Sequence, residues 1–242
     1  QSFNFIATVE AIIEAGAKPI IVNVDKSLNM CPLDLEKKIN KKTKVIIPVH
    51  MMGVSAKMNE IMKIAKKYKL KVLEDNCESM GSKYNKKYLC NIGDAGVVSF
   101  DFGKTITCGE GGMILTKNKS IDKFSREYHD HGHELNPKYP RGLDTKTITG
   151  FNYRMTEMQA AVGKIQLKKL DTVIRESKKR YLAIYKKIFK NKELEFREIP
   201  KNSEQIYDTL IFFVKNKTLR GKIIQVLNKN GIGTKNLPDA IN

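Results

Sequence analysis

One lysine of this chain stands in a sequence context that suits covalent chemistry. Lys104 follows the apolar run 95–100 and precedes a glycine-rich turn over 109–112, and Ser99 stands five residues before it. A lysine amine forms an imine with an aldehyde once burial and a nearby cation favour its uncharged state. A hydroxyl close by can bind a phosphate. These two abilities are what pyridoxal phosphate requires of its protein, although Lys104 taken alone could also be a surface charge.

A carboxylate stands at a matching place upstream. Asp75 follows a strand predicted over 71–73, just as Lys104 follows the strand predicted over 95–100. Ligands of open α/β sheets bind at the carboxyl ends of the strands, so one ligand could touch both residues. The ring nitrogen of pyridoxal phosphate must be kept protonated, and a carboxylate does this. The alternative is that Asp75 only caps a helix or a loop.

Three histidines alternate over a short stretch, at His129, His131 and His133. On a strand they would share one face, as metal ligands do. The stretch is a glycine-containing part of a long polar loop predicted over 128–149, and no fourth ligand stands near it, so we expect no metal site. His50, at the end of another predicted strand, could line the site or be structural.

Helical and strand-like patterns alternate, which predicts an α/β fold. Thr156 and Gln159 have the spacing of a capping box, and a long helix is predicted from there past Tyr185. Its predicted buried stripe is Met155, Met158, Val162, Ile165 and Leu170. The other predicted helices are 8–14, 32–39, 58–68 and 219–227, and the other predicted strands are 19–24, 44–49, 112–116, 193–199 and 209–214.

We expect two domains, a large one over 1–175 and a linking helix with part of a small α+β domain over 176–242. The chain opens on Gln1 rather than Met. The sequence is therefore expected to be an internal fragment of a longer protein.

The formal net charge is +18, with 44 Lys and Arg against 26 Asp and Glu. The lysines are spread along predicted helix faces, with no basic stripe interleaved with aromatics, so nucleic acid is the weakest partner and anionic small molecules are favoured. No apolar run reaches the length of a membrane span, and the four cysteines form no CxxC pair. We expect a soluble, cytoplasmic protein without a membrane partner.

Several segments occur in the order of a known family. They are Phe3 to Thr8, Ile47 to His50, Leu73 to Glu78, Ser99 to Gly112 and Gly150 to Ala161. Together they resemble the DegT/StrS group of nucleotide-sugar aminotransferases, from Phe3 to about Leu170 and more weakly beyond. The resemblance implies fold type I of the pyridoxal phosphate enzymes, which is a three-layer sandwich with a mostly parallel sheet, followed by the start of a small α+β domain.

The resemblance also implies roles for single residues. Lys104 matches the lysine that binds the cofactor aldehyde and moves the proton between cofactor and substrate carbons. Asp75 matches the partner of the ring nitrogen, and Ser99 matches a phosphate ligand. Phe5 matches the aromatic residue that stacks on the cofactor ring.

Two further matches carry consequences. Asn152 matches a residue that reaches the phosphate held by the other subunit, which implies a homodimer with shared active sites. Glu78 stands where the family often has Gln, near the phenolic oxygen of the cofactor. A charged carboxylate would repel a phenolate there, so we expect Glu78 to be protonated or turned away.

The expected activity is transfer of an amino group from an amino acid, glutamate by resemblance, to a nucleotide-linked keto-sugar in surface polysaccharide or deoxyamino-sugar biosynthesis. The fragment itself is expected to be inactive. One alternative is a dehydratase of the same fold, although such relatives typically replace the lysine by histidine. Another is a non-catalytic relative, against which the retained Asp75 and Lys104 argue.

Overall fold

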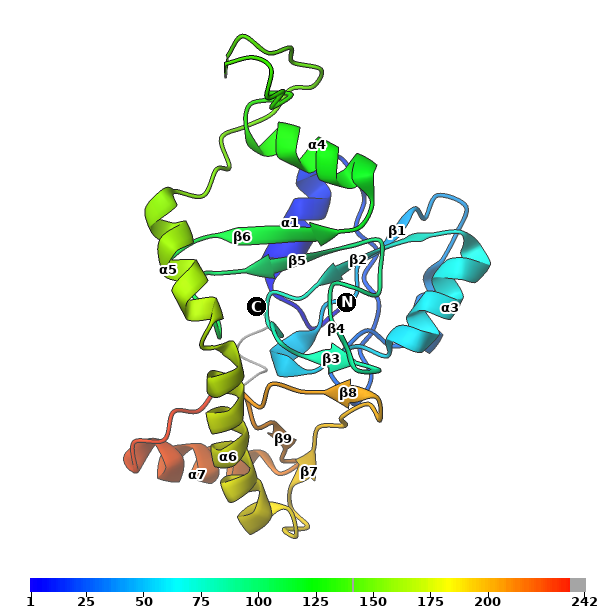
Figure 1. The fold of residues 1–242 in the computed structure, drawn as a ribbon. Coiled ribbons are helices and arrows are strands. Elements are labelled where there is room, and N and C mark those ends of the chain that lie inside the picture. The colour runs from blue at the N-terminus through cyan, green and yellow to red at the C-terminus, as the bar shows by residue number, and fades with distance from the viewer. Residues whose placement is uncertain (141, 236–242) are drawn as a thin grey trace.

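The computed structural model describes residues 1–140 and 142–235 and places a four-stranded sheet at the centre of the chain (Figure 1). The helices are α1 (Ile6–Glu14), α2 (Pro32–Lys38), the 3-10 turn η1 (Met51–Gly53), α3 (Met58–Tyr68), α4 (Lys119–His129), α5 (Glu157–Leu167), α6 (Leu170–Ile188) and α7 (Lys217–Lys229). The strands are β1 (Val45–Ile46), β2 (Lys71–Asp75), β3 (Lys83–Tyr84), β4 (Lys87–Tyr88), β5 (Ala95–Ser99), β6 (Gly112–Thr116), β7 (Glu195–Phe196), β8 (Ser203–Glu204) and β9 (Phe212–Phe213).

The central sheet has the order β1-β2-β5-β6. The strands β1, β2 and β5 are parallel, and β6 returns antiparallel to β5. β1 is short because Pro48 has no N–H to donate, and the ladder resumes as a bridge between Val49 and Asp75. The carboxyl ends of β2 and β5 therefore lie side by side, with Asp75 in register with Val97.

The main core lies beside this sheet, around α3. Four α3 side chains, Met58, Ile61, Ile64 and Ala65, are buried at helical spacing, and they pack with Val72 of β2 in one cluster. Polar caps fix the ends of other helices. The Asn118 side chain accepts from two backbone N–H groups of α4, and Thr156 and Gln159 form the predicted capping box of α5.

The segment after α6 returns to the sheet-bearing part of the chain. β8 pairs with β3, and β7 pairs with β9. Arg197, which is buried, donates from Nε to the Ser27 carbonyl at 2.6 Å and from Nη2 to the Met51 carbonyl at 2.7 Å. Its Nη1 donates to the Met52 carbonyl at 3.1 Å. One side chain thus ties the C-terminal segment to the turn that follows β1.

Comparison with the sequence predictions gives a mixed result. The predicted strands of the central sheet and the helices α1, α2, α3 and α7 are confirmed, within a few residues at their ends. The strand predicted over 19–24 is wrong: only Val24 forms a bridge there, to Met30. The single long helix is also wrong, because it is divided at Lys168 and Lys169 into α5 and α6.

The predicted buried stripe of the long helix is covered only at its ends, where the partly buried Met155 and Leu170 pack against the core cluster around Phe100 and Cys108. Met158 is 80% exposed, and Val162 and Ile165 are about half exposed. The face of α5 near Gly163 approaches Cys108, whose Cβ would lie 3.7 Å from an added side chain. The apolar spacing correctly identified the apolar face of α5, but it did not show whether another surface covers that face. The helix α4, the β3–β4 hairpin and β8 were not predicted from the sequence.

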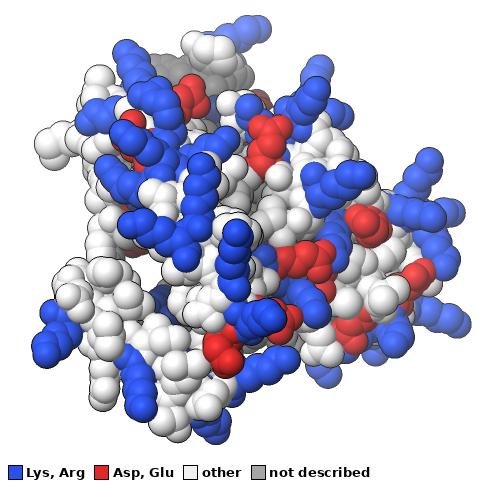
Figure 2. Space-filling model, turned by 90° about the horizontal axis from the view of Figure 1, so that it is seen from below, with Lys and Arg blue, Asp and Glu red and all other residues white. Residues whose placement is uncertain are grey.

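Basic side chains project from most of the face drawn in Figure 2, with acidic side chains between them. This distribution matches the spread of lysines along the sequence. No helix in the described part of the chain is long and apolar enough to cross a membrane.

Replacing Arg197 by Ala will lower the free energy of unfolding by about 3 kcal/mol, because three backbone carbonyls lose their donor, two of them in buried hydrogen bonds. Urea unfolding followed by circular dichroism measures the change. Arg175 is a matched control, since its side chain is 68% exposed. Arg175→Ala should cost less than about 0.5 kcal/mol, and equal losses for the two variants would contradict the tie made by Arg197.

Candidate functional site

The end of β2 carries two carboxyl groups with opposite surroundings. Glu74 is fully buried, and its Oε2 lies 3.2 Å from His50 Nε2. It also accepts from the backbone N–H groups of Cys90, Ile92 and Gly93 at 2.7 to 2.9 Å. Burial acts to raise the pKa of Glu74, but His50 and these N–H groups lower it overall. Since His50 Nδ1 accepts from the Ala56 N–H at 3.1 Å, the proton of the imidazole is on Nε2.

Asp75, the next residue, turns to the other side of the strand. Its Oδ2 accepts from the Thr8 hydroxyl at 2.7 Å, and its Oδ1 accepts from the Cys77 N–H at 3.2 Å. Burial, together with the charge of Asp75, raises the pKa of the Cys77 thiol, which therefore stays protonated. Two donors thus orient the Asp75 carboxylate at the sheet edge where ligands of such folds bind.

Lys104 lies in a turn after β5, and its ammonium group is paired. Its Nζ donates to Glu78 Oε1 at 2.8 Å, and the two side chains are 21% and 26% exposed. Partial burial acts to lower the pKa of Lys104, but the hydrogen bond and charge of Glu78 outweigh it, with the charge of Asp101 adding to them, so the pKa is raised. The sequence analysis expected a nearby cation to lower this pKa, whereas the structure places a carboxylate there.

An aromatic ring and a hydroxyl complete this side of the sheet. The Phe5 ring lies 6.0 Å from Lys104 Nζ and is 66% exposed, so its face is free to receive a flat ligand. Ser99 ends β5, and its Oγ accepts from the Asp101 N–H at 3.2 Å, which leaves its own hydrogen available to a ligand.

These contacts link four of the six predicted site residues. Lys104 lies over the Phe5 ring and pairs with Glu78. Asp75 is hydrogen-bonded to Thr8, whose hydroxyl also lies 3.2 Å from Oδ1 of Asn4, the neighbour of Phe5. Ser99 lies at the base of the Lys104 turn. We call the four residues and Ser99 the lysine cluster.

Asn152 belongs to another surface. It is exposed on the segment between α4 and α5, where its backbone bridges to Asp130. The three histidines also diverge. The His133 ring is 2.8 Å from Asp144, the His129 ring faces the Arg126 carbonyl, and His131 lines a pocket. In the described residues no group of three potential ligands is arranged to hold a metal ion.

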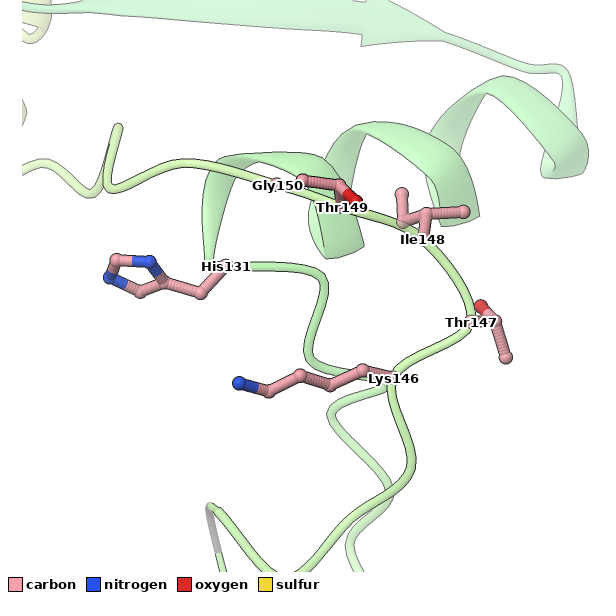
Figure 3. A pocket seen from close by; sticks show the side chains of 6 residues that line it. All are labelled: His131, Lys146, Thr147, Ile148, Thr149 and Gly150. Atoms are coloured by element: carbon pink, nitrogen blue, oxygen red, sulfur yellow. The ribbon is translucent and has the colours of Figure 1, made fainter.

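The pocket at His131 is a hollow of about 500 Å³ next to α4 (Figure 3). It is lined by His131 and the segment 146–150, and the side chains of His131 and Lys146 extend to the same side. Its lining has no carboxylate and no Phe, Tyr or Trp ring, so the chemistry of the chain is better placed at the lysine cluster.

Comparison with known proteins gives this geometry a context. Residues 1–238 match the DegT/DnrJ/EryC1/StrS aminotransferase family. The chain belongs to this family. Within it, the chain is 38% identical over 210 residues to the GDP-perosamine synthase of Escherichia coli O157:H7, covering 86% of this chain and 55% of that protein.

Solved structures agree with the family. The aminotransferase of Psychrobacter cryohalolentis is 30% identical, with a TM-score of 0.85, over 94% of this chain and 62% of that one. The E. coli GDP-4-keto-6-deoxy-D-mannose-3-dehydratase with bound hydrated PLP is 27% identical, with a TM-score of 0.82, over 96% and 63%. The fold expected from the sequence, an α/β fold with a mostly parallel sheet, is confirmed. The chain spans less than two thirds of the length of these relatives.

The residues of this DegT-family chain fit pyridoxal phosphate. An amine, a carboxylate, an open ring face and a hydroxyl match its aldehyde, ring nitrogen, ring and phosphate. Asn4 Nδ2 and Asn76 Oδ1, which neighbour Phe5 and Asp75 in the sequence, are buried without a hydrogen-bond partner in the described residues. Unpaired polar atoms of this kind favour a polar ligand at the site.

Sequence reasoning missed two supports of the site. Thr8 reads as an ordinary residue in the first turn of a helix, and only the fold brings it to Asp75. His50 was left open, and the structure makes it the partner of Glu74. The signal that could have found this pair is the position of both residues at the ends of adjacent parallel strands.

Replacing Glu74 by Gln will lower the free energy of unfolding by about 2 kcal/mol at pH 7, because the amide NH2 would face groups that are all donors. The folded-state pKa of Glu74 is lowered from 4.5, so its stabilisation is present above that pH and is lost as the pH falls through the folded value. The difference between the two proteins should therefore shrink below pH 4.5.

Urea unfolding at several pH values measures this difference. Glu10→Gln, on the exposed side of α1, removes the same charge without a buried partner. A gap between wild type and Glu74→Gln that stays constant from neutral to acid pH would contradict the role given to the ionised carboxylate.

Proposed function

We propose that the protein is a pyridoxal phosphate-dependent aminotransferase that moves an amino group from an amino acid, glutamate in our expectation, to a nucleotide-linked keto-sugar. The observation that carries the proposal is the lysine cluster: Lys104 beside an exposed Phe5 ring, with Asp75 on the same sheet edge. Membership of the family supports it. The cofactor, when bound, supplies the electron sink that stabilises a carbanion at the substrate carbon.

Each residue of the cluster has one task in this proposal. Lys104 binds the cofactor aldehyde through its amine and then, once displaced by substrate, takes and returns the proton at Nζ. Asp75, oriented by Thr8 and the Cys77 N–H, accepts from the ring nitrogen. The Ser99 hydroxyl donates to the phosphate, and Phe5 covers one ring face.

The net charge of the chain and the names of its relatives both support a nucleotide-linked sugar as the substrate. A net charge of +18 attracts anions such as a nucleotide diphosphate. The E. coli relative is named for a GDP-linked sugar. We also propose a cytoplasmic location and a role in surface polysaccharide or deoxyamino-sugar biosynthesis. All four cysteines are free, as thiols are in a reducing compartment.

A dehydratase of the same fold is the second candidate, because the chain resembles the E. coli dehydratase. The amine of Lys104 favours amino transfer, since dehydratases of this fold typically carry histidine there. Product analysis with a GDP-linked 4-keto sugar and glutamate separates the two. A gain of an amine supports our proposal, and loss of water without lasting amination supports the dehydratase.

We propose that the protein acts as a homodimer with shared sites. Met158, Val162 and Ile165 form one exposed apolar stripe on α5, on the side away from Gly163 and Cys108. Asn152, just before this helix, is exposed and so could reach a partner's phosphate. We further propose the division into domains 1–175 and 176–242, with α6 as the link; residues 236–242 lie outside the described residues.

Replacing Lys104 by Ala in the full-length protein will abolish the visible absorption band of the lysine-linked cofactor. Lys57 is a matched control, because its side chain is 26% exposed and pairs with Asp25 and Glu198 at 3.0 Å. Lys57→Ala should keep the band. Absorption spectra after reconstitution with pyridoxal phosphate give the result, and an unchanged band in Lys104→Ala refutes the assignment.

Replacing Met158 by Glu will weaken self-association at least about tenfold, because it places a charge at the most exposed residue of the apolar stripe. Lys164→Glu adds the same side chain on another face of α5 and should leave association unchanged. Sedimentation velocity over a concentration series distinguishes them. If the Met158 variant associates as the wild type does, the stripe is not the subunit interface.

A further inference from the structure

Glu78 is the one member of the lysine cluster that the proposed chemistry does not use. Its Oε1 accepts from Lys104 Nζ at 2.8 Å. Both side chains are about three quarters buried, so solvent screens the pair less than it would on an open surface. In this arrangement the carboxylate is turned toward the lysine and forms an ion pair with it.

The backbone around Glu78 fixes its position. The Gly53 N–H donates to the Glu78 carbonyl at 3.0 Å, and the Gly53 carbonyl accepts from the Ile206 N–H at 3.1 Å. Gly53 has a φ of +78°, and a side chain there would lie 2.6 Å from Asp208 Oδ1. The turn that carries Glu78 is therefore held between the sheet and the C-terminal segment.

The lysine side of the pair is also fixed. The Lys104 N–H donates to the Asp101 carbonyl at 3.1 Å, and the Gly103 N–H donates to Asp101 Oδ1 at 3.0 Å. The Lys104 side chain then reaches from this turn across to Glu78.

The carboxylates and the aromatic ring that face Lys104 favour its charged state, and the protonated Cys77 thiol beside them carries no charge. Cys77 and Glu78 come from the segment after β2, Asp101 from its own turn, and the Phe5 ring from the start of α1. Burial of Asp208, in the C-terminal segment, together with the charge of Glu78, raises the pKa of Asp208 to about 6. Carboxylates and a ring face both stabilise an ammonium ion.

An ammonium group has no lone pair and cannot attack an aldehyde. We propose that Glu78 holds Lys104 protonated in the free protein, so that Lys104 captures an aldehyde only after passing a proton to the Glu78 carboxylate. Glu78 is thus a positioning residue: it acts on the aldehyde only through the proton that it shares with Lys104. This inference rests on Lys104 being the aldehyde-binding lysine of the proposed function.

The step balances without an outside acid or base. Lys104 gives one proton to Glu78, and its lone pair then forms the C–N bond while the C=O electron pair moves to oxygen. That oxygen takes one proton from the nitrogen and one from Glu78, and it leaves as water as the C=N bond forms. Glu78 is again a carboxylate, and the positive charge is again on the nitrogen beside it.

Replacing Glu78 by Gln keeps the shape of the side chain and removes its charge. The proposal predicts that the pH midpoint at which Lys104 becomes reactive falls by about one unit, which exposes about tenfold more free amine at a given lower pH. Glu110→Gln is the matched control, since Glu110 is exposed in the turn after Lys104. It should leave the midpoint unchanged.

The measurement uses the cofactor-free, full-length protein. Trace labelling with isotopic acetic anhydride over a pH series, followed by mass spectrometry of each lysine peptide, gives the midpoint of Lys104 independently of activity. The wild type supplies a second test that needs no variant. Lys104 should titrate above the exposed Lys164 in the same sample, and a midpoint at or below that of Lys164 overturns the proposal.

Reconstitution with pyridoxal phosphate alone gives a spectroscopic readout. The pH at which the visible band of the lysine-linked cofactor changes should also be lower in Glu78→Gln. A variant that binds the cofactor more weakly at every pH, with both midpoints unmoved, would show a structural role and overturn the proton-holding role. Failure of Lys104→Ala to lose the band would instead overturn the assignment of Lys104, so the two failures are distinguishable.

Discussion

The buried carboxylate of Glu74 is the interaction on which the site depends. It accepts four hydrogen bonds, from His50 of one loop and from three backbone N–H groups of another, without access to water. An ionised group in that position is tolerated only because all its partners are donors. It therefore fixes the loops on both sides of β2. Asp75, one residue further on, is presented to the opposite side by the alternation of the strand.

The same constraint explains why the lysine cluster can form from distant segments. Asp75 is held from α1 by Thr8, and the turn of Glu78 is held by Gly53, which in turn bonds to the C-terminal segment. Lys104 comes from the end of β5, the strand in register with β2. Because β2 and β5 are parallel and adjacent, their ends deliver an acid and an amine to one edge. The segment after α6 is thus part of the support of the site, through Arg197 and Ile206, even though it contributes none of the cluster.

What the sequence could predict follows from which interactions are local. Lys104, Asp75 and Ser99 were found because each stands at the end of a continuous apolar run, and such runs are short-range patterns. The capping box of Thr156 and Gln159 is equally local. The partnership of Glu78 with Lys104 spans 26 residues, and that of Thr8 with Asp75 spans 67, so neither is visible as spacing. The prediction that Met158, Val162 and Ile165 of α5 are buried was wrong for a related reason. Periodicity indicates which side of a helix is apolar, but it does not indicate which surface covers that side.

The long-range electrostatic field of this protein is positive, whereas the charges immediately around Lys104 are negative. Over the whole molecule the excess of lysine gives a positive field, which draws anions from a distance and weakens with salt. Within the site the charges close to Lys104 are acidic, namely Glu78 and Asp101, with Asp208 beside Glu78. An anionic ligand that the surface attracts therefore reaches a locally acidic site. Its negative groups are stabilised there only next to a hydroxyl, a backbone N–H or the ammonium group of Lys104. Local repulsion of this kind restricts how an anionic ligand can lie, since its negative groups must avoid the carboxylates.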